Sequence, residues 1–98
     1  MNIQAMMKQA QKLQKEMLSA KNEIDNKEYE GKSSFVTVKL KGTKEVIDIK
    51  IENEGLDADE IELLQDMLVV ALNDAMKKID KDTEEKLGKY TQGMPGLF

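Results

Sequence analysis

The sequence predicts an α+β fold: an α-β-β-β-α protomer with a small antiparallel sheet between two long helices, assembled as a homodimer. Apolar residues recur every three or four positions across residues 3–24, which is the spacing of one helix face. Apolar and polar residues alternate within residues 27–52, which is the period of strands. A helical period then returns after Asp57. A chain of 98 residues fits one domain, which we expect to span residues 1–98.

The first helix is predicted from an unbroken heptad seam, whose members lie alternately three and four residues apart. No glycine or proline occurs before Gly31, and the segment is rich in the good helix formers Gln, Lys, Glu, Met and Ala. About 22 helical residues, at 1.5 Å each, make a rod roughly 33 Å long. The seam consists of Ile3, Met6, Ala10, Leu13, Met17, Ala20 and Ile24.

A hairpin is expected next, because two apolar rows alternate with polar residues on either side of a glycine-containing turn. A turn centred on that glycine sets Val38 opposite Ile47, so that both rows share one face of the sheet. A shorter strand over residues 27–32 is expected to precede the hairpin, with Tyr29 facing inward and Gly31 near the following bend. The two rows are Val36, Val38 and Leu40, and Ile47, Ile49 and Ile51.

The second helix is expected to begin at residues 57–60, where Asp57 and Glu60 have the spacing of a capping box. Residues 67–72 are apolar nearly all round the helix, and such a helix must be buried nearly all round. One small sheet and one thin helix cannot cover it, so a second copy of the chain is the economical partner. The residues expected at this dimer interface are Leu63, Met67, Leu68, Val70 and Ala71.

The same helix is expected to end near Leu87, with Gly88 as the residue that follows its last turn. The segment 88–98 contains three glycines and Pro95, and we expect it to be a flexible tail.

Charge is distributed unevenly along the chain. The first 50 residues carry ten lysines against seven acidic residues, whereas residues 51–98 carry five lysines against twelve acidic residues. All the cationic side chains are lysines, which suit contacts with phosphates better than the reading of bases. Lys8, Lys12 and Lys15 share the helix face opposite the seam, and the hairpin adds Lys39, Lys41 and Lys44 as secondary candidates for contacts with DNA.

The composition makes an enzyme improbable. Without cysteine or histidine the chain lacks disulfides, thiolate nucleophiles, imidazole bases and the usual zinc ligands. Helix capping explains the acidic residues 57–60 better than a calcium site, because the EF-hand spacing is absent. We therefore expect no metal, cofactor or small-molecule substrate. The longest apolar run has six residues, so we expect no membrane span and a cytoplasmic protein.

The order of several segments carries a resemblance to a known family. They are the basic, Met- and Gln-rich residues 6–14, the Glu30-Gly31 strand, the 36–51 hairpin, residues 64–75, residues 86–89, and residues 93–97 of the tail. In this order the chain resembles the YbaB/EbfC family of bacterial nucleoid-associated proteins. The resemblance implies a homodimer with projecting helices. It also implies a nucleoid-located protein that binds DNA and alters its conformation, with effects on nucleoid organisation and gene expression.

One alternative of another class stays open at this point. A helix–hairpin–helix chain with a heptad seam also suits a dimeric protein-interaction module or a chaperone-like adaptor that does not bind DNA. Binding to unrelated DNA duplexes at low salt distinguishes the two.

Overall fold

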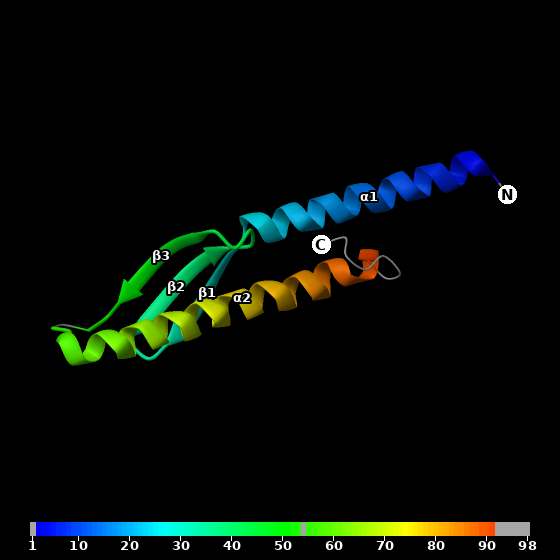
Figure 1. Cartoon of the computed structure of the whole chain (residues 1–98). Coiled ribbons are helices and arrows are strands. Elements are labelled where there is room, and N and C mark those ends of the chain that lie inside the picture. The colour runs from blue at the N-terminus through cyan, green and yellow to red at the C-terminus, as the bar shows by residue number, and fades with distance from the viewer. Residues whose placement is uncertain (1, 54, 92–98) are drawn as a thin grey trace.

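The computed structural model describes residues 2–53 and 55–91 and confirms the predicted order of helices and strands (Figure 1). Helix α1 (Ile3–Asn26) leads into a sheet of β1 (Glu28–Ser33), β2 (Val36–Lys41) and β3 (Val46–Ile51). A short 3₁₀ helix, η1 (Ala58–Glu60), leads directly into α2 (Ile61–Thr91). The molecule measures 71 × 21 × 14 Å, because the two helices run antiparallel and overlap only over part of their lengths.

Helix α1 has defined ends. The side chain of Asn2 accepts a hydrogen bond from the backbone N–H of Gln4 at 3.1 Å, which satisfies one of the free donors of the first turn. Lys27 is extended and ends the helix, with its N–H donating to the carbonyl of Glu23. Of the predicted seam, Ile24 is buried and Met17 and Ala20 are half-buried, whereas the four members nearer the N-terminus are exposed.

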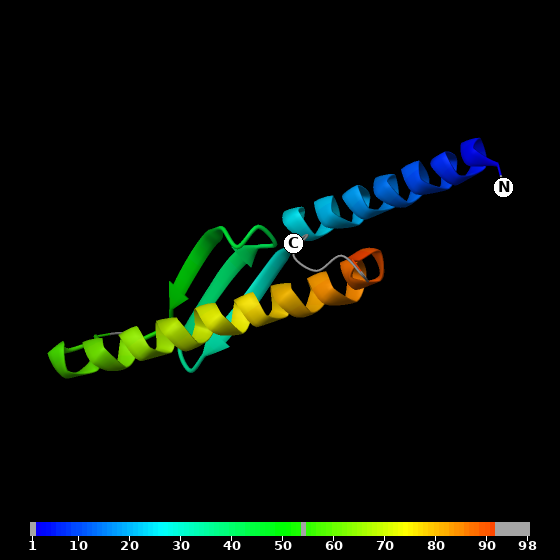
Figure 2. The ribbon, with the colours of Figure 1, turned by 45° about the vertical axis from the view of Figure 1, so that its right-hand side comes forward.

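The sheet has the order β1-β2-β3, and α2 covers only part of it. Val36, Val38 and Leu40 are fully buried between the sheet and the helices. Among the described residues α2 contacts β1 and β2 but not β3, which lies to one side of the helix in Figure 2. The apolar residues of β3 therefore remain 40–46% exposed.

The predicted register of the hairpin was wrong by two residues. Val38 pairs with Ile49, not Ile47, and Val36 pairs with Ile51. The connecting loop comprises residues 42–45, with Lys44 at a positive φ of 75°, and the pairing of the two strands is irregular at Lys39/Leu40. A shift of two residues keeps both apolar rows on one face, as expected.

Two glycines set how closely the helices approach the sheet. Gly31 lies within β1, and a Cβ there would lie 2.0 Å from the carbonyl oxygen of Ala71 in α2. A Cβ on Gly42 would lie 1.8 Å from the carbonyl oxygen of Ile24, so the hairpin turn abuts the end of α1. Both positions therefore exclude any side chain.

Two predictions about the ends of α2 were also wrong. The Asp57 side chain makes no capping hydrogen bond; instead its carboxyl group lies close to that of Glu60 and raises the pKa of Glu60. Gly88 does not end the helix, which continues to Thr91. The rest of the predicted tail, residues 92–98, lies outside the described residues.

Candidate nucleic-acid interface

The three lysines of α1 form an exposed basic face on a projecting helix. Lys8, Lys12 and Lys15 are all exposed, at positions i, i+4 and i+7. They lie on the side of α1 opposite Met17 and Ile24, which pack against the core. No ion pair within residues 2–53 and 55–91 involves any of these three lysines. Their charges are therefore available to an outside partner.

The hairpin lysines are placed differently from those of α1. Lys39 lies 3.8 Å from a carboxylate oxygen of Glu28, and Lys44 lies 3.3 Å from one of Asp80. Lys41 is partly buried. The turn touches α1 at Ile24, which is nine residues and about 14 Å along the helix from Lys15. The structure thus does not join the two groups of lysines into one surface.

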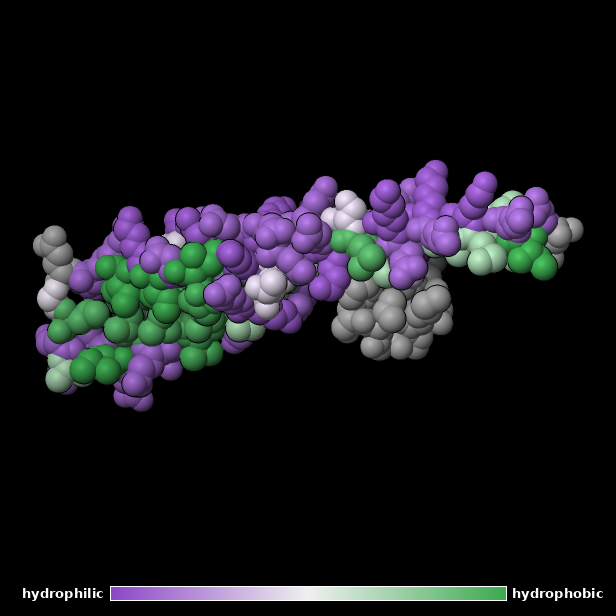
Figure 3. Space-filling view, turned by 90° about the horizontal axis from the view of Figure 1, so that it is seen from above, coloured by the Kyte–Doolittle hydropathy of each residue, from purple (hydrophilic) through white to green (hydrophobic). Residues whose placement is uncertain are grey.

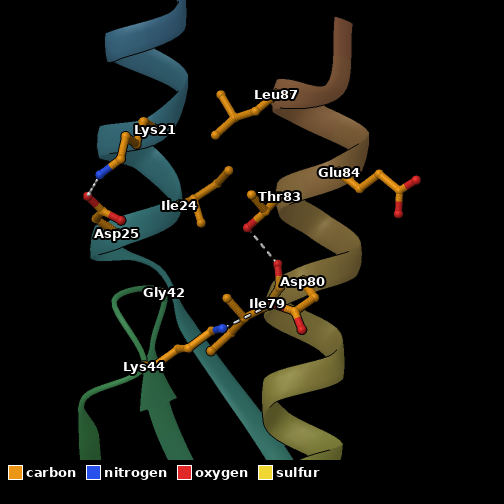
Figure 4. A pocket seen from close by; sticks show the side chains of 10 residues that line it. All are labelled: Lys21, Ile24, Asp25, Gly42, Lys44, Ile79, Asp80, Thr83, Glu84 and Leu87. Atoms are coloured by element: carbon orange, nitrogen blue, oxygen red, sulfur yellow. Dashed lines mark hydrogen bonds and ion pairs between the residues drawn. The ribbon is translucent and has the colours of Figure 1, made fainter. Parts of the chain in front are cut away.

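A groove of about 390 Å³ lies where α1, the hairpin turn and α2 meet (Figure 4). Its apolar wall is formed by Ile24, Ile79 and Leu87, each about 98% buried. Four of its five charged lining residues pair with one another, Lys44 with Asp80 at 3.3 Å and Lys21 with Asp25 at 3.1 Å. Because apolar packing and neutralised charges dominate, the groove joins the two helices rather than presenting reactive groups.

A cluster around Asp82 fixes α2 to the first strand. Asp82 accepts a hydrogen bond from the Tyr29 hydroxyl, and its Oδ2 lies 3.2 Å from Nζ of Lys86 and 3.4 Å from Nζ of Lys27. The hydrogen bond from Tyr29 lowers the pKa of Asp82 below its usual value, and Lys86 and Lys27 make smaller contributions in the same direction. Burial and the neighbouring carboxylate raise the pKa of Tyr29. The cluster's charges are satisfied within the protomer, so its role is structural.

The outer edge of β1 is closed by side chains of α2. The N–H of Lys32 donates to Asp74 at 3.1 Å, and this bond lowers the pKa of the Asp74 carboxyl. Nζ of Lys78 donates to the carbonyl of Glu30 at 2.7 Å. Asp74 and Lys78 also pair with each other, at 3.5 Å. Capping of this kind protects a strand edge from pairing with other chains. Within the described residues nothing comparable caps the outer edge of β3.

The predicted dimer residues fall into three environments. Leu63 and Val70 are 47% and 54% exposed, and Met67 and Leu68 are half-buried. Ala71 is fully buried against Gly31 and serves the core of the protomer.

Sequence reasoning missed an exposed apolar area formed by β3 and the first turns of α2. Figure 3 shows it as a green region at the sheet end of the molecule. The alternating isoleucines of β3 predict one apolar face of the strand, but they do not show that α2 leaves this face uncovered. The described exposed apolar residues of β3 and of the first turns of α2 are Val46, Ile47, Ile49, Ile51, Ile61, Leu63, Val69 and Val70.

The described residues contain neither a group of acidic side chains that could hold a metal ion nor a helix long and apolar enough to cross a membrane. The acidic residues 57–60 form no such group.

Comparison with known proteins gives a consistent result. The sequence model of the YbaB/EbfC DNA-binding family matches residues 1–94. A nucleoid-associated protein of Bacillus licheniformis is 50% identical, over 99% of this chain and 94% of its own. One of Ligilactobacillus salivarius is 46% identical, over 99% and 95% of the two chains. An uncharacterized Helicobacter pylori protein of known crystal structure has the same fold, with a TM-score of 0.70, 22% identity and coverage of 95% and 99%.

Proposed function

The chain belongs to the YbaB/EbfC DNA-binding family, and from this premise we propose that it is a nucleoid-associated protein that holds duplex DNA mainly by phosphate contacts and changes its conformation. The observation that supports this most directly is the exposed basic face of Lys8, Lys12 and Lys15, which makes no ion pair with any other described residue. Phosphate contacts of this kind position a protein on DNA without reading its sequence.

The distribution of charge supports the same orientation. Helix α2 packs against the side of α1 that carries Ile24, and two of its carboxylates pair with lysines: Asp80 with Lys44 and Asp82 with Lys86. The basic face of α1 points the other way. The protein therefore approaches DNA with α1, and the acidic helix faces away from the phosphates.

We further propose that the functional unit is a homodimer. Leu63, Met67, Leu68 and Val70 contribute to the interface, and the apolar residues of β3 extend it. An exposed apolar area on this scale is costly for a monomer, and β3 also offers an uncapped strand edge. A dimer presents two α1 helices, and two separate contacts with one duplex provide a means of bending or bridging it.

Family membership also suggests that the protein is not an enzyme and that it acts at the nucleoid, with effects on nucleoid organisation and gene expression. On this proposal its partners are DNA and a second copy of the chain, and its function requires no cofactor.

A gel-shift assay with several unrelated duplexes at about 50 mM salt tests DNA binding, because phosphate contacts are strongest at low salt. We expect similar affinities for all duplexes. Distances between fluorophores at the two ends of a duplex then report the change in DNA conformation. Failure to bind any duplex would contradict the proposal and favour the protein-interaction adaptor.

A further inference from the structure

The apolar side of α1 continues past the end of α2, as Figure 1 shows. Met17 is half-buried and packs against the core. The apolar residues nearer the N-terminus are all exposed, both those of the heptad seam and Met7 beside it. A contiguous exposed apolar face of this kind marks a contact surface. We call these residues the free stripe: Ile3, Met6, Met7, Ala10 and Leu13.

The spacing of the free stripe favours a helix as its partner. It continues, without a break, the heptad that α1 uses further along the chain to pack against α2. The positions that flank the seam within residues 3–14 are Met7, Gln9 and Gln14, so no charged side chain borders it. A strongly charged partner helix gains nothing from such flanks, whereas a second copy of α1 has flanks of the same neutral kind.

The position of α2 fixes the direction in which two α1 helices can pair. Leu87 lies beside Ile24 and Lys21 (Figure 4). Thr91 is four residues, or about 6 Å, further along this antiparallel helix, at about the level of Met17. A parallel pair of α1 helices would therefore run on into two copies of α2. In an antiparallel pair, the tip of each helix stops before it reaches the partner's α2.

We propose that the free stripes of two α1 helices, from two different dimers, pack antiparallel against each other. With Met6 set opposite Ala10 of the second copy, each large side chain meets a small one, and Ile3 meets Leu13. The contact is about 16 Å long on a helix about 10 Å wide. This is far smaller than the roughly 800 Å² that each partner buries in a stable interface. The pairing is therefore weak in solution and forms mainly where dimers are held close together.

The consequence of this pairing for DNA rests on the proposed function and deepens it. In the proposed dimer, joined at the sheet end, both α1 helices project, so that pairing of their tips links one dimer to the next. The lysine face of each helix lies opposite its free stripe and stays on the outside of the pair. The two paired helices therefore hold separate duplexes, and linked dimers bridge DNA.

Introduced cysteines test the pairing without DNA, because the natural chain has no cysteine. Equal amounts of the Met6→Cys and Ala10→Cys proteins are mixed with oxidised glutathione. Antiparallel pairing predicts that the mixed disulfide forms roughly tenfold faster than either homodisulfide. In the control mixture, Lys8→Cys with Lys12→Cys, both cysteines face away from the stripe, and no such preference is expected.

Two results of this experiment would overturn the proposal. Faster formation of the Met6→Cys homodisulfide would mean that the helices pair in parallel. Equal preferences in the two mixtures would mean that the free stripe is not the contact between copies.

Capture of a labelled duplex by a second duplex fixed to a bead measures bridging. Met6→Gln/Leu13→Gln removes apolar contacts but keeps every lysine and a good helix propensity. This variant should bind a single duplex as the wild type does, while capturing at least fivefold less of the second duplex. The control, Ala5→Gln/Ser19→Gln, changes two exposed residues on the lysine side of α1 and should capture as much as the wild type.

The two proposals fail in different ways in this assay. Wild-type capture by the Met6→Gln/Leu13→Gln variant would overturn the role of the free stripe in bridging. Failure of the wild-type protein to bind even a single duplex would contradict the proposed function instead, and the cysteine mixtures would still decide whether the free stripes pair.

Discussion

At the scale of single residues, the closest contacts between helix and sheet depend on the absence of a side chain at Gly31. No periodicity reveals this, because a glycine within a strand looks like a bend in the sequence. The physical reason is the direct approach of Ala71 and Ala75 of α2 to the backbone of β1. These small residues were visible in the sequence, but only the fold shows that they meet Gly31.

Replacing Gly31 with Ala should therefore destabilise the protein. The new Cβ would lie 2.0 Å from the carbonyl oxygen of Ala71 and 2.7 Å from the backbone nitrogen of Ala75, so α2 must move. We expect the free energy of unfolding, measured by urea denaturation, to fall by about 1–3 kcal/mol or more. Gly88→Ala is the matched control, since its Cβ meets nothing closer than 4.0 Å and Ala favours the helix. Equal stability of the two variants would contradict the close packing.

The Tyr29–Asp82 hydrogen bond should make stability depend on pH. The pKa of the Asp82 carboxyl is lowered in the folded protein. The charged carboxylate therefore stabilises the fold at pH values above its pKa in the unfolded chain, about 4, and this stabilisation is lost as the pH falls through the pKa in the folded protein. Tyr29→Phe removes the largest cause of the shift and a hydrogen bond to a charged group, worth roughly 1.5–3 kcal/mol. We expect the difference in unfolding free energy between wild type and variant to be smaller at pH 3 than at pH 7. A difference independent of pH would show that Asp82 is not the acceptor.

At the scale of elements, the periodicity of the sequence predicted both helices and all three strands. It did not predict which strands α2 covers, because alternation shows only that one face of a strand is apolar. The sequence did not predict the register of the hairpin. Neither the positive φ of Lys44 nor the irregular pairing at Lys39/Leu40 has a sequence signal as strong as the Asn-Gly pair that marks a tight hairpin turn. Of the candidate site, the lysine face of α1 was predictable because helix geometry alone fixes it.

Strand β3 provides a test of the dimer. Ile49 is 45% exposed, so Ile49→Asp should leave the fold of the protomer intact while placing a charge in the interface. Sedimentation should show dissociation, and circular dichroism should show retained secondary structure. Lys50→Asp introduces the same side chain on the opposite face of β3 and should leave the dimer intact. A monomeric wild-type protein at micromolar concentration would refute the dimer altogether.

At the scale of the whole molecule, the two ends of the protein have different surfaces. The sheet end carries the exposed apolar residues of β3 and the start of α2, and the other end is the projecting α1 with its exposed lysines (Figure 1). The excess of acidic residues in the second half is partly neutralised by ion pairs with lysines of the first half, such as Lys27–Asp82 and Lys44–Asp80. Association through the sheet end therefore leaves both basic helices free, as the proposed DNA-binding unit requires.

The salt dependence of DNA affinity tests the central claim most directly. If all six lysines of two α1 faces contact phosphates, the logarithm of affinity should fall against the logarithm of salt concentration with a slope of about −5. Replacing Lys8, Lys12 and Lys15 with Gln preserves helix propensity and should weaken binding and flatten the slope equally on every duplex. The control, Gln at the exposed Lys77, Lys81 and Lys89 of α2, should retain the wild-type slope. A wild-type slope in the α1 variant would contradict the account, because DNA would then be held elsewhere.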